Sequence, residues 1–376
     1  MSLDLFTAYD MSFETDKKTL HTLVQQALPA VASSTISPVL TNFLISASKS
    51  SLQIMSSDSI TTILTSLNHS INIGDSGKAL IPASRLISIL KELRDEDRVV
   101  IGVKDSTALI ATDDTKWNLP LHRLSSYPAL NLTAEMHKFS KDLLYSALKR
   151  VKFAVSMDPS RPNLAVVSGL DNKITASDSY RLQQVIMSDN LPFPILIPGN
   201  KISLLMKFME QTPNSTVSLG LNDKNLIVVI GTCLVSLPKL SLKFPDVDKA
   251  ILKPALENDM ELELDREDLI SAIKKVRSAA DIDSGSITIT INSSNAEIKA
   301  KDKSGNYSSS VMPVLWGGTL RSFVVSHKYL IEMLRSHTSK RCSILLGPDT
   351  KLRKLPLLVR DIESGLVSVL SQSVDF

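Results

Sequence analysis

Apolar residues recur along the chain with a helical spacing in three short segments. The segments 19–24, 142–148 and 268–273 each begin at a polar residue and continue into leucine, isoleucine or valine. Apolar positions three and four residues apart lie on one face of a helix. The pattern therefore predicts three amphipathic helices, separated by roughly 120 to 130 residues, which is too long for a solenoid repeat and typical of a domain.

A second helical pattern recurs in the same order. The segments 81–90, 197–206 and 324–331 each run from an apolar strand end through a polar residue into an amphipathic stretch. A polar residue at that junction is typical of a helix N-cap. Because both patterns keep the same order and interval, we predict one domain present three times.

Between the helices, the apolar spacing changes to that of strands. The segments 52–55, 60–64 and 286–291 largely alternate apolar and polar residues, which is typical of antiparallel strands with one solvated face. Each repeat is therefore predicted to hold two helices packed on antiparallel sheets, an α+β fold. We place the domain boundaries so that the domains are 11–131, 132–254 and 255–376.

Composition adds few constraints. The chain of 376 residues is 43% hydrophobic and 22% charged, which is ordinary for a soluble protein. No apolar run approaches a membrane span, and the N-terminus lacks the layout of a signal peptide. The two cysteines, Cys233 and Cys342, lie in different predicted domains and form neither a metal cluster nor a disulfide framework. We expect a cytoplasmic protein without a metal, a cofactor or a membrane partner.

The chain carries no recognisable catalytic motif. Residues 74–79 resemble a phosphate-binding loop, but the loop is too short and lacks the Ser or Thr that should follow Lys78. The six histidines are scattered without the spacing of metal ligands. We therefore expect no catalytic residue. A small-molecule enzyme of α+β architecture stays open as an alternative, and it would need an active site that no motif of this sequence reveals.

Basic residues gather in the helical segments, although the net charge is only +3. If the repeats present these helices on one side, they form a cationic lining for a polyanion; otherwise they only solvate the outer faces of the helices. The candidate residues of such a lining are Arg85, Lys149, Arg150, Lys152, Lys201, Lys207, Lys274, Lys275 and Arg277.

Four segments resemble one known family. Residues 175–182, Thr-Ala-Ser-Asp-Ser-Tyr-Arg-Leu, resemble the Ala-Thr-Asp-Gly-His-Arg-Leu segment of the bacterial DNA polymerase III β subunit, the sliding clamp family. Residues 244–246 resemble its Phe-Pro-Asp-Tyr segment, with Val247 in place of Tyr. Residues 38–44 and 161–164 resemble two further stretches, and the similarity runs in order from about Met11 to the C-terminus.

The resemblance implies a homodimer joined head to tail into a closed ring of six similar domains, with double-stranded DNA in the hole. It also implies a pocket that tethers DNA polymerase, the clamp loader and repair proteins by short peptide motifs. Leu182 and Pro245 would be apolar walls, while Arg181 would order the peptide backbone or close the pocket by hydrogen bonding. Carried over by position, the pocket residues are Leu164, Ser177, Ser179, Tyr180, Arg181, Leu182, Pro245, Lys249 and Leu370, the last as the residue nearest the pocket wall from the C-terminal strand.

The chain departs from the family pattern at the pocket and at the expected seam of the ring. Ser179-Tyr180 replaces the usual Gly-His pair, and Ser34 stands where an arginine is usual. The predicted dimer interface joins Trp117 and Leu119 to Ala279 and Ala280, where bulkier aliphatic residues are usual. Each lost methylene removes about 0.8 kcal/mol of burial, so a looser ring is expected.

Residues 1–10 are an N-terminal extension relative to the family. Within it Leu3, Asp4, Leu5 and Phe6 are similar to the Gln-Leu-Ser/Asp-Leu-Phe peptide of clamp partners. We hypothesise that this tail docks into a clamp pocket; a frayed terminus or an added edge strand is the simpler alternative. The rival to a DNA-encircling clamp is a clamp-like interaction or decoy module that does not encircle DNA.

Overall fold

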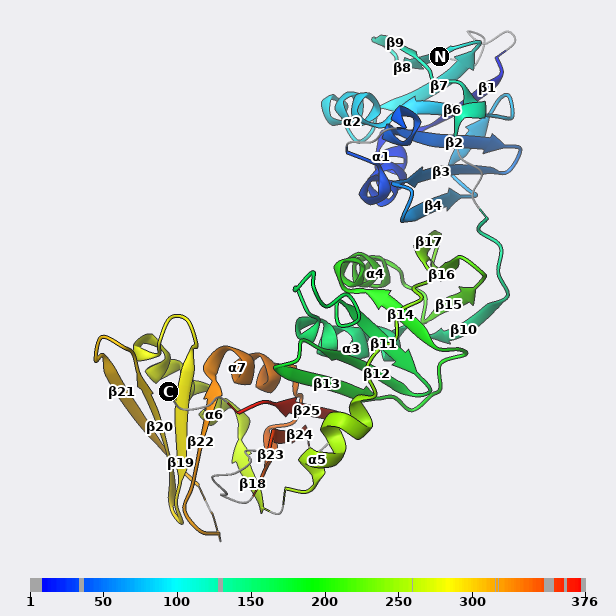
Figure 1. The fold of residues 1–376 in the computed structure, drawn as a ribbon. Helices are drawn as coiled ribbons and strands as arrows, with labels where there is room; N and C mark the ends of the chain where they lie inside the picture. Colours follow the sequence, from blue (N-terminus) through cyan, green and yellow to red (C-terminus); the bar gives the residue numbers. More distant parts are fainter. Residues whose placement is uncertain are drawn as a thin grey trace. The chain divides into compact units, whose positions relative to one another are not determined.

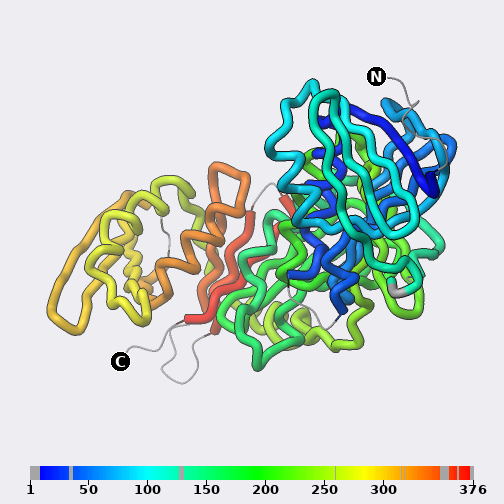
Figure 2. Tube along the Cα trace, turned by 90° about the horizontal axis from the view of Figure 1, so that it is seen from above, coloured from blue at the N-terminus to red at the C-terminus, as the bar shows by residue number. Residues whose placement is uncertain are grey.

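The computed structural model describes residues 9–33, 37–127, 131–258, 260–314, 316, 318–347, 355–361 and 364–372. The chain divides into two compact units. Figures 1 and 2 show its helices and strands coloured along the sequence from the N-terminus to the C-terminus. The first unit holds Met1–Lys141 and Lys207–Lys239, and the second holds Asp142–Met206 and Leu240–Phe376. No helix of the described ranges is long and apolar enough to cross a membrane.

The first unit begins with strand β1 (Met11–Asp16) and helix α1 (Lys17–Ala27), which contains the first predicted helical segment. The Asp16 carboxylate caps the helix by accepting a hydrogen bond of 2.7 Å from the Thr19 N–H. The apolar stripe of the helix, from Leu20 to Ala27, is buried. It packs in one core with Phe13, Phe43 and other strand residues of this unit.

Two sheets build the first unit. The five-stranded sheet has the order β5 (Ile71–Ile73), β1, β7 (Arg98–Lys104), β8 (Thr107–Ala111) and β9 (Lys116–Pro120). The eight-stranded sheet has the order β10 (Met136–Ser140), β15 (Thr216–Leu221), β16 (Asn225–Ile230), β17 (Cys233–Pro238), β4 (Thr62–Leu67), β3 (Ser51–Ser57), β2 (Asn42–Ser48) and β6 (Gly77–Pro82).

Strands from distant parts of the sequence meet inside that eight-stranded sheet. Strand β17 pairs antiparallel with β4, with Val235 opposite Ile63. We call this pairing the first seam. Helix α2 (Ala83–Glu92) follows β6, and short helical turns lie at η2 (Leu28–Ala30), η3 (Pro38–Thr41) and η4 (Leu124–Ser126).

The second unit also contains an eight-stranded sheet. Its order is β14 (Ile195–Pro198), β11 (Val166–Leu170), β12 (Lys173–Ser177), β13 (Arg181–Ile186), β25 (Leu366–Leu370), β24 (Leu357–Asp361), β23 (Arg341–Leu346) and β18 (Met260–Asp265). Strand β13 pairs antiparallel with β25, with Gln183 opposite Ser368. We call this pairing the second seam.

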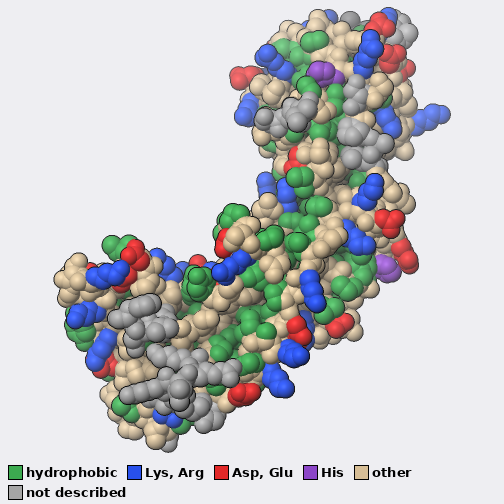
Figure 3. All heavy atoms as spheres, viewed as in Figure 1, with side chains coloured by type: hydrophobic (Ala, Val, Ile, Leu, Met, Phe, Trp, Pro, Cys, Tyr) green, Lys and Arg blue, Asp and Glu red, His purple; other side chains and the backbone are tan. Residues whose placement is uncertain are grey.

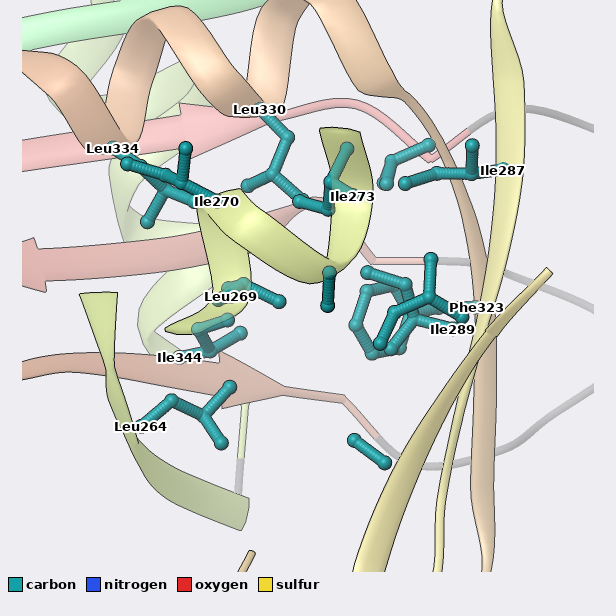
Figure 4. Close-up of a cluster of buried hydrophobic side chains, with 14 of the residues drawn as sticks. Leu264, Leu269, Ile270, Ile273, Ile287, Ile289, Phe323, Leu330, Leu334 and Ile344 are labelled. Atoms are coloured by element: carbon teal, nitrogen blue, oxygen red, sulfur yellow. The ribbon is translucent and has the colours of Figure 1, made fainter. Parts of the chain in front are cut away.

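A four-stranded sheet and two helices complete the C-terminal part of the second unit. The sheet order is β21 (Tyr307–Pro313), β20 (Asn295–Lys301), β19 (Ser286–Ile291) and β22 (Arg321–Ser326). Figure 4 shows side chains of α6 (Arg266–Val276) and α7 (His327–Ser336) converging with those of the strands. Leu269 and Ile273 of α6, Leu330 of α7 and Ile289 of β19 are all nearly inaccessible in this one core.

The order of the elements repeats three times along the chain. Each repeat runs strand, helix, three strands, strand, helix, three strands; the first begins at β1, the second at β10 and the third at β18, and β5 is an extra strand of the first. The second repeat contains α3 (Lys141–Val151) and α4 (Gly199–Gln211). The predicted α+β architecture of three similar domains is confirmed, while the boundaries at 131 and 254 stay predictions.

Candidate functional site

A tight turn precedes the strand that forms the second seam. The Asp178 carboxylate accepts hydrogen bonds of 3.0 Å from the backbone N–H groups of Tyr180 and Arg181. The Ser177 hydroxyl accepts a bond of 3.3 Å from the N–H of Ser179, whose φ of 79° lies in the left-handed region. The turn holds Tyr180 outward, with 56% of its surface exposed.

The Arg181 side chain is almost wholly enclosed by groups of the protein itself. Its Nε donates to Asp178 at 3.0 Å, its Nη2 donates to the carbonyl of Phe153 at 2.7 Å, and its Nη1 pairs with Glu332. Only 9% of the side chain is exposed. The guanidinium lies over the rings of Phe153 and Tyr329, at 5.0 Å and 4.4 Å from their centroids. These contacts favour a closing role for Arg181 over a role in ordering a peptide backbone.

The aromatic arrangement continues outward from Arg181. The Tyr180 and Tyr329 rings are stacked with centroids 6.0 Å apart and 25° between their planes. Burial, together with the charge of Asp178, raises the pKa of Tyr329, so the Tyr329 hydroxyl is neutral at physiological pH. Phe153, Arg181, Tyr329 and Tyr180 thus form a ladder, which we call the aromatic ladder, with its exposed end at Tyr180.

Leu182 lies beneath the connecting segment between the second and third repeats. That segment includes a π-helical turn η6 (Asp248–Leu252) and the short helix α5 (Lys253–Leu256). Leu182 is 1% exposed and shares an apolar cluster with Val247, Leu252, Ala255, Leu345, Leu358 and Val369. Asp248 fixes the segment by pairing with Lys173 and by accepting a bond of 2.9 Å from Gln184. Leu182 therefore packs in an apolar cluster that the chain itself covers, and its role as a pocket wall stays a prediction.

The remaining predicted pocket residues differ in exposure. Leu164 and Ser177 are buried, and the Ser177 hydroxyl donates to the carbonyl of Arg181 at 2.8 Å. Pro245 is half-buried, and Lys249 and Ser179 are exposed. The turn and the connecting segment therefore bring buried and accessible groups together near the start of β13.

The prediction for Leu370 is wrong by one residue. Leu370 is 1% exposed and lies in the core around α6 and α7, whereas Val369 shares the cluster of Leu182. In the register of the second seam Val369 is opposite Leu182, and Leu370 is opposite Arg181. Because successive strand residues point to opposite faces, the shift by one residue changes the face that is reached.

Most of the predicted DNA-facing cations are exposed on the helices or just after them. Figure 3 shows Lys and Arg side chains interspersed with acidic and apolar ones on the drawn face of each unit. Lys201 is half-buried. The exposed members are Arg85, Lys149, Lys152, Lys207, Lys274, Lys275 and Arg277.

Arg150 is a correction to that set. Its Nη2 lies 3.0 Å from the Asp361 carboxylate and its Nε donates to the Ser336 carbonyl at 3.2 Å, with 12% of the side chain exposed. Burial lowers the pKa of Arg150, and the charge of Asp361 opposes that shift. Burial would raise the pKa of Asp361, but hydrogen bonds from Ser339 and Ser364 hold it well below its usual range. Arg150 therefore joins the second and third repeats internally and is not available to a phosphate.

The predicted interface residues divide into two kinds. Trp117 and Leu119 lie on β9, the terminal strand of the five-stranded sheet. Ala279 and Ala280 are 7% and 8% exposed within the core around α6 and α7. They can bury little further surface, because they already pack inside their own repeat, and this corrects their assignment as contact residues.

Known proteins are similar to the chain in sequence and in fold. Residues 11–131 match the family described as DNA polymerase III beta subunit, N-terminal domain. A beta sliding clamp of Chlamydia pneumoniae is 23% identical over 371 residues, covering 96% of this chain and 98% of the relative. One of Staphylococcus aureus is 26% identical over 217 residues, covering 53% and 57%. Residues 11–131 thus match the N-terminal domain of this family, and the chain as a whole is similar to bacterial β sliding clamps over nearly its full length.

Solved sliding clamps share its fold. The clamp of Bartonella birtlesii aligns with a TM-score of 0.87 at 20% identity, covering 97% of this chain and 100% of the other. The clamp of Caulobacter crescentus aligns with a TM-score of 0.88 at 18% identity, covering 97% and 99%. The fold is therefore that of a sliding clamp. Within the described residues, no three His, Cys, Asp or Glu side chains are grouped so that they could hold a metal ion.

Sequence reasoning missed several residues that complete the site. Phe153, Tyr329 and Glu332 surround Arg181, and Val369 lies against Leu182. No local motif marks them, because they meet only when β13 pairs with β25 and α7 packs beside the seam. The tail residues Leu3, Asp4, Leu5 and Phe6, and Ser34, lie outside the described residues.

Proposed function

We propose that the protein is a non-catalytic processivity factor that encircles duplex DNA as a closed homodimer. It tethers the replicative polymerase, the clamp loader and repair proteins through the site around Tyr180 and Leu182, and it acts in the cytoplasm, where bacterial DNA lies. The observation that carries the proposal is the repetition of one strand pairing at two internal seams.

The two seams join equivalent strands. In the first seam the last strand of the second repeat, β17, pairs with the fourth strand of the first repeat in chain order, β4. In the second seam the last strand of the third repeat, β25, pairs with the equivalent strand of the second repeat, β13. The last strand of the first repeat, β9, and the fourth strand of the third repeat, β21, are the equivalent strands that take part in neither seam. Both end their sheets among the described residues.

A third seam of the same kind would join β21 of one copy to β9 of another. Such a head-to-tail contact either closes into a ring or grows into a filament. A closed dimer is the arrangement that the clamp family uses, and it satisfies both edges. Alternate side chains of β21 are exposed, including Tyr307 at 57% and Val311 at 60%, and they offer apolar area to the half-buried Trp117 of the other copy. Leu119 is only 9% exposed and, like Ala279 and Ala280, packs inside its own repeat.

The exposed helix cations suit a ring around DNA. A closed ring holds DNA topologically, so its contacts can be weak phosphate attractions that carry no sequence information and permit sliding. A modest net charge of +3 is then sufficient. The cations proposed to face DNA are Arg85, Lys149, Lys152, Lys201, Lys207, Lys274, Lys275 and Arg277.

The seam proposal is tested by a variant of the β9 edge. Asn118→Pro removes a backbone donor from the edge strand and should prevent pairing with β21. We expect the wild type to have the mass of two chains in sedimentation, and Asn118→Pro to shift toward one chain and lose retention on circular DNA. The control is Ser322→Ala on β22, the edge strand at the other end of the sheet from β21, and it should leave the mass unchanged. A fully dimeric Asn118→Pro with normal unfolding would contradict the proposed seam.

The N-terminal tail is proposed to dock into the partner pocket. Replacing Leu5 and Phe6 together by Ala should raise the affinity for an added partner peptide if the tail competes for the site. Equal affinity of the variant and the wild type, measured by fluorescence anisotropy, would contradict this part of the proposal.

A further inference from the structure

Two large apolar side chains in the second unit are almost fully exposed at equivalent places. Met157 is 93% exposed and Ile282 is 89% exposed. Met157 follows α3 and the turn η5 (Lys152–Ala154), and Ile282 follows α6 and the turn η7 (Arg277–Ala279). Each stands five residues after an exposed cation, Lys152 in the second repeat and Arg277 in the third.

Hydrogen bonds hold both loops in defined conformations. In the second repeat the Ser156 N–H donates to the Leu164 carbonyl at 3.0 Å, and the Ser156 hydroxyl accepts from the N–H of Asp158 at 3.2 Å. In the third repeat the Asp281 carboxylate accepts from the N–H groups of Asp283 and Ser284 at 3.1 Å and 3.0 Å. The backbone that carries each tip is therefore ordered before a ligand covers it, so only the side chain loses conformational freedom on binding.

The first repeat provides an internal contrast. Its helix α1 has the same eleven-residue length as α3 and α6, and the turn η2 follows it directly. The position of the cation is occupied by the half-buried Leu28, and the position of the apolar tip by the exposed Ser33. Within this chain, the cation and the apolar tip are thus present together or absent together, which points to one shared ligand.

Carboxylates beside the tips are paired with cations. Asp158 lies 3.5 Å from the Nε of Arg161, and the Nζ of Lys303 lies 3.2 Å from Asp283 and 3.8 Å from Asp281. These pairs reduce the repulsion that unpaired carboxylates would exert on a polyanion. The tips themselves are apolar and close to electrically balanced, so they suit the sugars and base edges of a groove better than phosphates.

We propose that Lys152 with Met157, and Arg277 with Ile282, are two copies of a two-point contact with duplex DNA. In each copy the cation binds a backbone phosphate, and the apolar tip lies against sugars and base edges in the minor groove. The inference rests on the proposed function and assigns a contact that does not depend on charge. It predicts that part of the DNA affinity is insensitive to salt.

Salt dependence separates the two halves of the contact. Each lost phosphate contact lowers the slope of log K against log salt by about 0.9, whereas loss of an apolar contact leaves the slope unchanged. We expect Met157→Ser/Ile282→Ser to weaken binding of the full-length dimer to a short labelled duplex by about three- to tenfold at every salt concentration. Because the dimer carries each cation twice, Lys152→Ala/Arg277→Ala removes four phosphate contacts and should lower the slope by about 3.6.

A matched control uses apolar residues exposed elsewhere in the same unit. Leu170 and Leu256 are 52% and 55% exposed, and Leu170→Ser/Leu256→Ser should bind duplex like the wild type. If the wild type is retained on DNA circles and Met157→Ser/Ile282→Ser binds as tightly as the control, the two-point contact is overturned while the clamp stands. A reduced slope for the serine pair also overturns it. If the wild type neither binds duplex nor is retained on circles, the proposed function itself fails.

Discussion

The two internal seams begin with the same turn and continue with different chemistry. Before the first seam, the Asp58 carboxylate accepts from the N–H groups of Ile60 and Thr61, as Asp178 does from those of Tyr180 and Arg181 before the second. The φ angles of the serines between them, 73° and 79°, also agree. The backbone of the turn is therefore set by the shared Ser-Asp-Ser sequence in both repeats.

The side chains that follow distinguish the seams. The first seam buries an apolar pair, Ile63 opposite Val235, where the second buries Gln183 opposite Ser368. The Ser368 hydroxyl donates to the side-chain amide oxygen Oε1 of Gln183 at 2.7 Å, and it lies 3.0 Å from His337 Nε2. The same strand pairing thus forms an apolar contact at the first seam and a polar contact beside the aromatic ladder at the second. Individual side chains cause this difference.

Removal of Arg181 should produce the largest effect. Arg181→Ala leaves the partly buried Asp178 carboxylate and the exposed Glu332 without their cation, and we expect a loss of about 3 kcal/mol in the free energy of unfolding. Binding of a partner peptide should also be lost, because the ladder would no longer hold Tyr329. The equivalent change Thr61→Ala should cost less than about 1 kcal/mol. Urea unfolding measures both losses. Equal losses would contradict the claim that Arg181 stabilises the second seam more than Thr61 stabilises the first.

The second seam should be sensitive to acid. Burial lowers the pKa of His337 to about 4, from an ordinary value of 6.5. The folded state disfavours the protonated ring, so its stability is complete above pH 6.5 and falls as the pH decreases toward 4. The loss reaches about 3 kcal/mol at 1.36 kcal/mol per pKa unit.

The histidine contribution is isolated by difference. His337→Gln should unfold with a weaker pH dependence than the wild type between pH 6.5 and 4 in urea titrations. Carboxylates away from the ring contribute equally to both proteins, and the pKa of Asp361, which interacts with His337, lies well below this pH range. Parallel pH profiles would show that His337 does not carry the acid sensitivity of this seam.

Exchange of the central pair should be asymmetric. Ile63→Gln places an amide in an apolar joint without a partner and should cost about 3 kcal/mol. Gln183→Ile removes one hydrogen bond but also a buried Nε2 that has no partner in the described structure, so its cost should stay within about 1 kcal/mol. If both substitutions lower the free energy of unfolding by the same amount, the two seams are chemically interchangeable.

The shared turn should contribute least. Asp58→Ala removes the acceptor of two backbone N–H groups and should cost about 1 kcal/mol in urea unfolding. Asp178→Ala should cost more, because it also removes an ion-pair partner of Arg181. Equal costs would indicate that Arg181 does not strengthen the second turn.

Periodicity predicted the architecture because each helix and strand buries one face in its own repeat. Leu182 and Tyr180 lie at one turn because local residues determine its backbone, and their role in a partner pocket stays a prediction. Val369 was missed because its orientation depends on the register between β13 and β25, and one residue reverses the face. Arg150 was misassigned because a basic residue on a helix looks the same in sequence whether it meets solvent or Asp361.

The most direct test of the proposed ring is retention on nicked circular DNA after incubation with a clamp loader shown to load its own clamp. A restriction enzyme then linearises the circle. The account predicts that the protein stays on the circle through gel filtration and is lost rapidly from the linear ends. Failure to be retained on circles would contradict the ring and favour a clamp-like interaction module that does not encircle DNA.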